Sequence, residues 1–211
     1  GRDGAWYVGD RLLDITFYPN FDPAQVQRGL PVGEGGKLQF IAHPAQKRRL
    51  FDKGAQVLET ADVALLAFHG MNGEDGSVQG MLDLMDVAYT SCGAMGSAVG
   101  MDKIAMKQLF RGCGFPVLAD AFIDRAQWKK DRKGCVEKIE GALRYPVFVK
   151  PANLGSSIGI SRAADRASLE RALDVAASFD RRILIERGVD HLKEVNCSVL
   201  GYGGEARASV L

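Results

Sequence analysis

The chain has 211 residues, 46% of them hydrophobic, so it can bury a substantial core. Its 27 Lys and Arg against 26 Asp and Glu give a formal net charge of +1, which argues against a general attraction to nucleic acid or to an anionic membrane. We expect neither partner, and the apolar runs are too short to cross a bilayer. No targeting segment is expected at the N-terminus. The four cysteines form no C-x-x-C pair, which favours a reduced, cytoplasmic protein.

The first hundred residues lead to a strand, a glycine-rich loop and a helix. Short strands are predicted over 6–8, with an extension over 12–17, and over 38–41 as an edge strand. The continuous apolar run 63–68 is typical of a strand buried on both faces, and it ends at His69. An amphipathic helix over 78–85 follows the loop. Ligands of α/β sheets bind at the carboxyl ends of strands, so His69 stands where a ligand is expected.

The second half has the pattern of a compact α+β unit, with a boundary near residues 100–116. Its predicted elements, in chain order, are a helix over 97–111, a strand over 117–123, a helix over 126–143, a strand over 147–150, a Gly/Ser loop over 153–159, a short strand near Ile160, a helix over 169–176 with Asp165 as its N-cap, and strands over 183–186, 194–200 and 206–211. The last two strands would expose an unpaired edge, which predicts that the chain by itself is poorly soluble or binds its ligand weakly.

The loop over 69–80 has the sequence HGMNGEDGSVQG, with a histidine, two carboxylates, a glutamine and four glycines. Its glycines permit positive φ and close approach of a ligand to the backbone. Glu74 and Asp75 stand just before the helix, where carboxylates favour the positive end of its dipole. The simpler interpretation makes His69 a turn residue and Glu74 a cap. The combination of residue types favours a ligand site.

The segment after Tyr145 joins an apolar strand to a glycine- and serine-rich turn. Lys150 closes the strand, so its ammonium lies at the rim of a low-dielectric region, which suits a phosphate. After Pro151, the turn over 155–159 offers backbone N–H groups and two hydroxyls to an anion. The segment lacks the G-K-[ST] of a Walker A loop. An ordinary hairpin is the alternative, but the Lys-Pro ending favours a lid over nucleotide phosphates.

Three further charged residues suit a nucleotide only in combination. Lys103 could be a second phosphate partner. Glu186 ends a strand and Glu194 follows the next loop. One of these carboxylates could accept a hydrogen bond from an adenine amino group, and the other could accept hydrogen bonds from ribose hydroxyls. Taken singly, each is an ordinary solvated charge.

With these motifs the chain resembles the D-alanine:D-alanine ligases of the ATP-grasp superfamily. The loop over 69–80 matches that family's signature, and the segments MDK, VKP, GSSIG and IE follow in the family's order and approximate spacing. The resemblance implies an α/β fold in three parts: a truncated Rossmann-like N-terminal domain over 1–102, the central ATP-grasp α+β subdomain over 103–190, and the first strands of the C-terminal grasp subdomain over 191–211. It also implies an internal fragment of the ligase that lacks both termini.

The resemblance implies that the complete enzyme uses ATP to join two D-alanines through a D-alanyl phosphate, for peptidoglycan precursor synthesis. It implies Mg²⁺ or Mn²⁺ as cofactor, with the metal ligands beyond Leu211, and a homodimer. The resemblance also assigns roles to single residues. Lys103 and Lys150 contact ATP phosphates, and Ser156 acts at the reacting centre with Ser157 in the same closing loop. Glu186 and the backbone of Arg187 and Val189 hold the adenine, and Glu194 holds the ribose. His69 and Glu74 belong to the D-alanine binding site, where His69 lines the pocket and the lesser role open to Glu74 is to brace it.

Two alternatives stay open. A ligase that joins D-alanine to D-lactate or D-serine would share these motifs, because the residues that choose the second substrate would follow Leu211. A non-catalytic ATP-binding grasp module is the alternative from another class. Another ATP-grasp carboxylate:amine ligase would account for Lys150 and Glu186 but leaves the loop over 69–80 unexplained.

Overall fold

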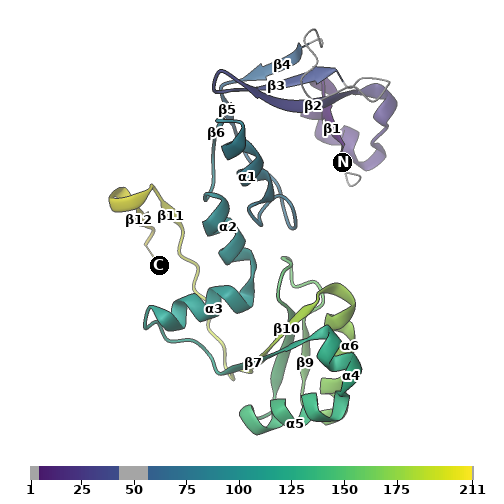
Figure 1. Cartoon of the computed structure of the whole chain (residues 1–211), viewed down its shortest axis with the longest axis vertical. Helices are drawn as coiled ribbons and strands as arrows, with labels where there is room; N and C mark the ends of the chain where they lie inside the picture. The colour runs from purple at the N-terminus through teal and green to yellow at the C-terminus, as the bar shows by residue number, and fades with distance from the viewer. Residues whose placement is uncertain (1–4, 43–56, 211) are drawn as a thin grey trace. The chain divides into compact units, whose positions relative to one another are not determined.

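The structure is a computed structural model that describes residues 5–42 and 57–210. The chain forms two compact units (Figure 1): the first comprises residues 1–117 with 152–158, and the second 118–151 with 159–211. These units differ from the predicted segments 1–102, 103–190 and 191–211, because residues 103–117 and the serine loop belong to the first unit. None of the helices described here is long and apolar enough to cross a membrane.

The first unit contains a four-stranded antiparallel sheet in which the strands follow chain order. These are β1 (Trp6–Val8), β2 (Gln27–Glu34), β3 (Lys37–Ala42) and β4 (Val57–Ala61). The prediction of an edge strand over 38–41 was wrong in one respect, since β3 lies between β2 and β4.

Short 3₁₀ helices, not a strand, connect β1 to β2: η1 (Asp10–Leu13), η2 (Ile15–Asn20) and η3 (Pro23–Gln25). The predicted strand extension over 12–17 was therefore wrong. The side chain of Asp14 accepts a hydrogen bond from the Thr16 backbone N–H at 2.9 Å, which favours a helical turn over an extended strand.

The rest of the first unit is built of β5 (Val63–Ala64), α1 (Ser77–Leu84), β6 (Ala88–Tyr89), α2 (Ala94–Met101) and α3 (Lys103–Gly112). Leu82 of the predicted amphipathic helix packs with Leu38 and Val87, which confirms that helix. The predicted buried strand over 63–68 was wrong beyond residue 64, and Leu65 is 80% exposed. Among the described residues β5 pairs only with β6, over two residues, so little covers the rest of the apolar run.

The predicted helix over 97–111 is divided at Asp102. This residue leaves the helical region (φ −87°, ψ 102°), and its side chain accepts from the backbone N–H groups of Ile104 and Ala105. Asp102 is thus the N-cap of α3, and Lys103 is the first residue of a new helix.

The second unit is an antiparallel sheet covered by helices on one face. The strand order is β7 (Asp120–Asp124), β10 (Arg182–Arg187), β8 (Val147–Pro151) and β9 (Ser161–Ala163), with α4 (Arg125–Lys130), α5 (Arg132–Ala142) and α6 (Arg166–Phe179). The predicted strands over 147–150 and 183–186 and the N-cap at Asp165 are confirmed. The strands predicted over 117–123 and near Ile160 begin later than expected, at Asp120 and Ser161. The predicted helix over 126–143 is divided at Asp131, whose side chain accepts from the Gly134 N–H at 2.8 Å.

Only short pieces of the last two predicted strands are observed: β11 (Val199–Leu200) and β12 (Arg207–Ala208), joined through the 3₁₀ helix η4 (Gly203–Glu205). Both strands are exposed.

The pleat of β8 and β10 determines which side chains face the helices and which lie on the opposite face of the sheet. Val149 and Ile185 point into the core beneath α4–α6. Successive residues of a strand point to opposite faces, so Lys150 and Glu186 share the face opposite the helices. Lys150 stands opposite Leu184 in the register, one diagonal step from Glu186.

Candidate functional site

The loop that begins at His69 is held in shape by its own carboxylates. His69 itself is exposed at the end of the apolar run. The Glu74 carboxylate accepts a hydrogen bond from the Gly70 N–H, and the Glu74 N–H donates to the Gly70 carbonyl at 2.9 Å. Glu74 therefore braces the loop through Gly70, and its predicted place in the D-alanine binding site stays a prediction.

Asp75 fixes the other end of the loop. Its carboxylate accepts from the backbone N–H of Asn72 at 2.8 Å and from that of Ser77 at 3.1 Å. Burial raises the pKa of Asp75, but the hydrogen bonds from Asn72 and Ser77 outweigh burial and leave the pKa below its ordinary value. Asp75 is thus an ionised carboxylate just before α1, whose N-cap is Gly76.

Gly73 packs against the residue that precedes His69. A Cβ at Gly73 would lie 2.3 Å from the Cβ of Phe68, so no larger residue fits without displacing backbone. The Phe68 ring in turn meets the Trp6 ring edge-on, with centroids 6.1 Å apart. The loop is therefore fixed to an aromatic contact that joins it to strand β1.

Lys150 and Glu186 form an ion pair on the face of the second unit opposite the helices. Their side chains are 26% and 11% exposed, respectively. The sequence assigned the two residues to different parts of one nucleotide, and the structure brings them into contact. A cation and an anion at the rim of a low-dielectric interior can exchange this mutual contact for contacts with a polar, charged ligand.

The serine loop after β8 has an unusual backbone. Leu154, Ser156 and Ser157 have φ values of 135°, 52° and 56°, which non-glycine residues rarely adopt. Both serine hydroxyls are exposed. Backbone strain of this kind persists where the surroundings enforce it, and it is concentrated at ligand-binding sites.

Lys103 contacts the base of the serine loop. Its ammonium donates to the Leu154 carbonyl at 2.6 Å and to the Ala152 carbonyl at 3.5 Å, while its backbone N–H donates to the Ala152 carbonyl at 2.9 Å. The sequence predicted a phosphate contact for Lys103 but gave no sign of this attachment. In the structure, Lys103 connects the start of α3 to the loop.

The remaining predicted residues lie at and beyond the end of β10. Arg187 is exposed, and its backbone N–H donates to the Ala119 carbonyl at 3.0 Å. Val189 and Glu194 are also exposed. The structure therefore brings together two sets within single units: Lys103 with the serine loop, and Lys150 with Glu186.

Gln79 is a functional candidate that residue-by-residue reasoning missed. It is buried on α1, three residues before the core residue Leu82. A polar residue on the apolar face of an amphipathic helix was the signal that could have identified it.

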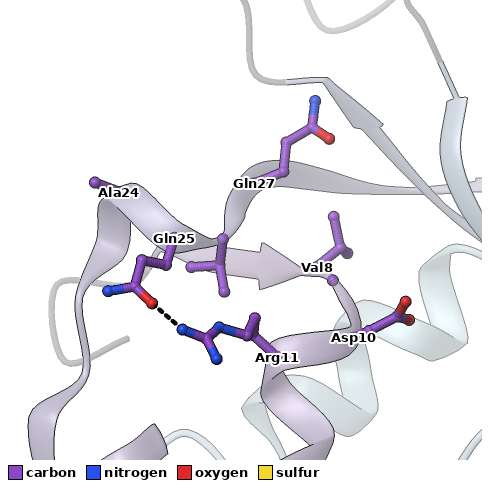
Figure 2. Close-up of a pocket in the computed structure, with 8 residues that line it drawn as sticks. Val8, Asp10, Arg11, Ala24, Gln25 and Gln27 are labelled. Carbon is purple, nitrogen blue, oxygen red and sulfur yellow. Dashed lines mark hydrogen bonds between the residues drawn. The ribbon is translucent and has the colours of Figure 1, made fainter.

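A pocket in the first unit lies away from the predicted residues. Figure 2 shows it at the end of β1, lined by Val8, Asp10, Arg11, Ala24, Gln25 and Gln27, among others. Within this lining, the Arg11 guanidinium donates a hydrogen bond to the Gln25 side-chain oxygen at 2.5 Å. None of the predicted site residues lines it.

No group of three or more His, Cys, Asp and Glu side chains that could hold a metal ion occurs within residues 5–42 and 57–210. Because Mg²⁺ usually takes one or two protein carboxylates together with substrate phosphates, we name no ligand for it among these residues.

The chain is similar to ligases along almost its whole length. The family model for the D-ala D-ala ligase N-terminus matches residues 2–92, and the model for the D-ala D-ala ligase C-terminus matches residues 109–211. The chain is 38% identical to a D-alanine–D-alanine ligase of Heliobacterium modesticaldum, over 99% of this chain and 54% of that protein. It is 47% identical to one of Bacillus cytotoxicus, over 95% of this chain and 52% of that protein. The chain thus spans about half the length of these curated relatives.

Solved structures agree in fold. The D-alanine–D-alanine ligase of Helicobacter pylori matches with a TM-score of 0.78 at 21% identity, over 98% of this chain and 60% of that one. The VanG D-Ala:D-Ser ligase of Enterococcus faecalis matches with a TM-score of 0.76 at 26% identity, over 98% and 56%. The mixed α/β fold, the loop over 69–80 and these similarities lead to one conclusion: the chain belongs to the D-alanine–D-alanine ligase family.

Proposed function

We propose that the full-length protein containing this chain joins two D-alanines at the expense of ATP. The observation that carries the proposal is the Lys150–Glu186 pair, which holds a cation and an anion together on the face of the sheet opposite the helices. Two relatives named D-alanine–D-alanine ligase, 38% and 47% identical to the chain, support the choice of substrate.

The proposed reaction has two steps. A carboxylate oxygen of the first D-alanine attacks the γ-phosphorus of ATP, and the bond from that phosphorus to ADP breaks to give D-alanyl phosphate. The amine of the second D-alanine then attacks the acyl carbon, and inorganic phosphate leaves with the electron pair of the broken C–O bond. The amine proton passes to solvent. Phosphoryl transfer of this kind depends chiefly on positioning and on neutralisation of charge.

The chain's cations and its serine loop fit these demands. We assign the ammonium groups of Lys150 and Lys103 to the ATP phosphates, Glu186 with the backbone of Arg187 and Val189 to the adenine, and Glu194 to the ribose. Ser156 and Ser157 present hydroxyls from a strained, exposed loop. Ser156 is the proposed catalytic residue. Closure of this loop would keep water from the acyl phosphate, which water destroys.

His69 is assigned to the pocket of the first D-alanine, with Glu74 as a brace. The hydrogen bonds between Glu74 and Gly70 support that division of roles. Mg²⁺ or Mn²⁺ would neutralise phosphate charge. The described residues form no cluster of three or more candidate ligands, and we assign no step to the metal.

The proposal extends to cellular context. D-Alanyl-D-alanine is a component of peptidoglycan precursors, so the protein would act in the cytoplasm in cell-wall synthesis, as a homodimer. The near-neutral charge balance supports a small-molecule substrate over nucleic acid or membrane.

The test is phosphate release by the full-length product of the gene, supplied with ATP and Mg²⁺. D-Alanine-dependent release with formation of the dipeptide is the expected result. Release only when D-serine or D-lactate is added with D-alanine would favour the alternative second substrates, and the similarity to VanG makes D-serine the first to try. If the protein binds ATP but releases no phosphate in response to any of these substrates, the non-catalytic ATP-binding grasp module would be favoured.

A further inference from the structure

Gln79 is a buried polar residue on the core-facing side of α1. It is 2% exposed, and its Nε2 donates to the Gly73 carbonyl at 2.9 Å. Its Oε1 is also buried and has no hydrogen-bond partner among the described residues. A buried acceptor without a partner destabilises the fold, and an apolar residue of similar size would avoid that cost. Core packing by itself does not account for a glutamine here.

The bond to Gly73 fixes the orientation of the Gln79 amide. The opposite orientation would place Oε1 against the Gly73 carbonyl oxygen, so that two acceptors would face each other. Nε2 is therefore the atom that faces the loop.

The other side-chain contacts of the loop act within the loop or at the helix start. Glu74 bonds to Gly70, and Asp75 bonds to Asn72 and Ser77. Gln79 instead joins the middle of the loop, at Gly73, to the interior of α1. Because Gly73 also contacts Phe68, the residue before His69, the Gln79 bond holds both sides of the turn that presents His69.

We propose that Gln79 is a positioning residue, which fixes the loop over 69–76 so that His69 meets the first D-alanine in a single arrangement. This inference rests on the proposed function. Gln79 acts through Gly73 and the loop, not by touching substrate. Its loss should weaken binding of D-alanine while it leaves ATP binding unchanged.

The test compares Gln79→Met with Gln108→Met in the full-length protein. Gln108 is exposed on α3 and serves as the matched control. We expect the KM for D-alanine to rise about five- to tenfold in Gln79→Met, which is the effect of losing one hydrogen bond. The KM for ATP should stay within about twofold of that of the unaltered protein. Unchanged KM for D-alanine would overturn the proposal. An equal loss in both KM values together with a lowered Tm would show a merely structural role and overturn it too.

The Gln79→Glu variant adds a second measurement, the pH dependence of the KM for D-alanine, which a merely structural role of Gln79 would not alter. Its carboxyl can donate to the Gly73 carbonyl only when protonated. The ratio of the variant's KM for D-alanine to that of the unaltered protein should therefore rise with pH, and a ratio independent of pH would contradict the inference.

Hydrogen exchange separates this inference from the proposed function. Backbone amides over 70–76 should exchange faster in Gln79→Met than in Gln108→Met, whatever the protein catalyses. If the unaltered protein shows no D-alanine-dependent phosphate release, the proposed function fails, while exchange still decides whether Gln79 holds the loop. Equal exchange in the two variants would refute the attachment itself.

Discussion

Replacing Lys150 with Met should destabilise the second unit through the carboxylate that it leaves behind. The Glu186 side chain is 11% exposed, and Lys150 is a cation paired with it. Met has a similar length and fills the space of the lysine stem, so the substitution removes charge with little change in packing. Glu186 then stays in a poorly solvated site with its ion pair broken.

The magnitude follows from the burial of the two side chains. Removing one partner of a fully buried ion pair costs about 3–5 kcal/mol. Because the Lys150 side chain is 26% exposed, water can solvate part of the vacated site, and we expect about 2–3 kcal/mol. Adding Glu186→Leu should recover most of the loss, to within about 1 kcal/mol of the starting protein, since the buried charge is then gone.

The assay is urea denaturation in a Trp6→Phe background, where the fluorescence of buried Trp128 reports on the second unit. Lys133→Met is the matched control, because the Lys133–Glu137 pair is 82% and 57% exposed and should contribute at most about 0.5 kcal/mol. A Lys150→Met variant no less stable than Lys133→Met would refute the assignment of Lys150 and Glu186 to a buried, coupled pair.

Three other predictions concern the loops and the second unit. Gly73→Ala should destabilise the first unit by roughly 2 kcal/mol or more, because its Cβ would lie 2.3 Å from that of Phe68. The control Gly100→Ala has open space on α2 and should be neutral or stabilising by up to about 1 kcal/mol. Similar Tm values for the two variants would contradict the predicted clash at Gly73. Burial and the hydrogen bond to Glu140 raise the pKa of Tyr145 to about 12 from 10.0, so the stability that its neutral phenol contributes is complete below pH 10.0 and is lost as pH rises towards 12. Tyr145→Phe should abolish this loss of stability at high pH, as measured by denaturation at a series of pH values. If the stability of the variant falls with pH as that of the unaltered protein does, the prediction is wrong. Lys103→Met should speed hydrogen exchange over 153–158, because the ammonium no longer binds the Leu154 and Ala152 carbonyls; unaltered exchange would show that the loop needs no such attachment.

The sequence was most informative where periodicity and capping agreed. The helix over 169–176 was correct because Asp165 accepts from the Ser168 N–H at 2.8 Å and Leu173 faces the core, so local and long-range signals coincide. The strand over 147–150 was equally clear, since an apolar run followed by proline has few alternatives, and β8 extends only one residue further, to Pro151.

The failures arose where a side chain competes with the backbone. Asp102 and Asp131 interrupt helices whose apolar spacing continues across them, because each carboxylate caps the next helix. The apolar run over 63–68 was predicted to be buried on both faces, but the extent of burial depends on neighbouring strands and not on the run itself.

Contacts within the site could be predicted only in part. Residue types identified Lys150, Glu186 and the loop after His69, but no spacing rule reveals that Lys150 pairs with Glu186 across a diagonal of β8 and β10. The contact of Lys103 with the Leu154 carbonyl joins residues 51 positions apart and involves a backbone atom, which carries no signal in the side-chain sequence.

The most direct test of the account follows the oxygen atoms of D-alanine. The full-length protein would be incubated with ATP, Mg²⁺ and D-alanine labelled with ¹⁸O in its carboxylate, and the released phosphate examined by mass spectrometry. If the carboxylate attacks the γ-phosphorus, each phosphate released carries an ¹⁸O atom taken from D-alanine. Phosphate without ¹⁸O, released in the presence of labelled D-alanine, would contradict the acyl phosphate and with it the proposed ligation.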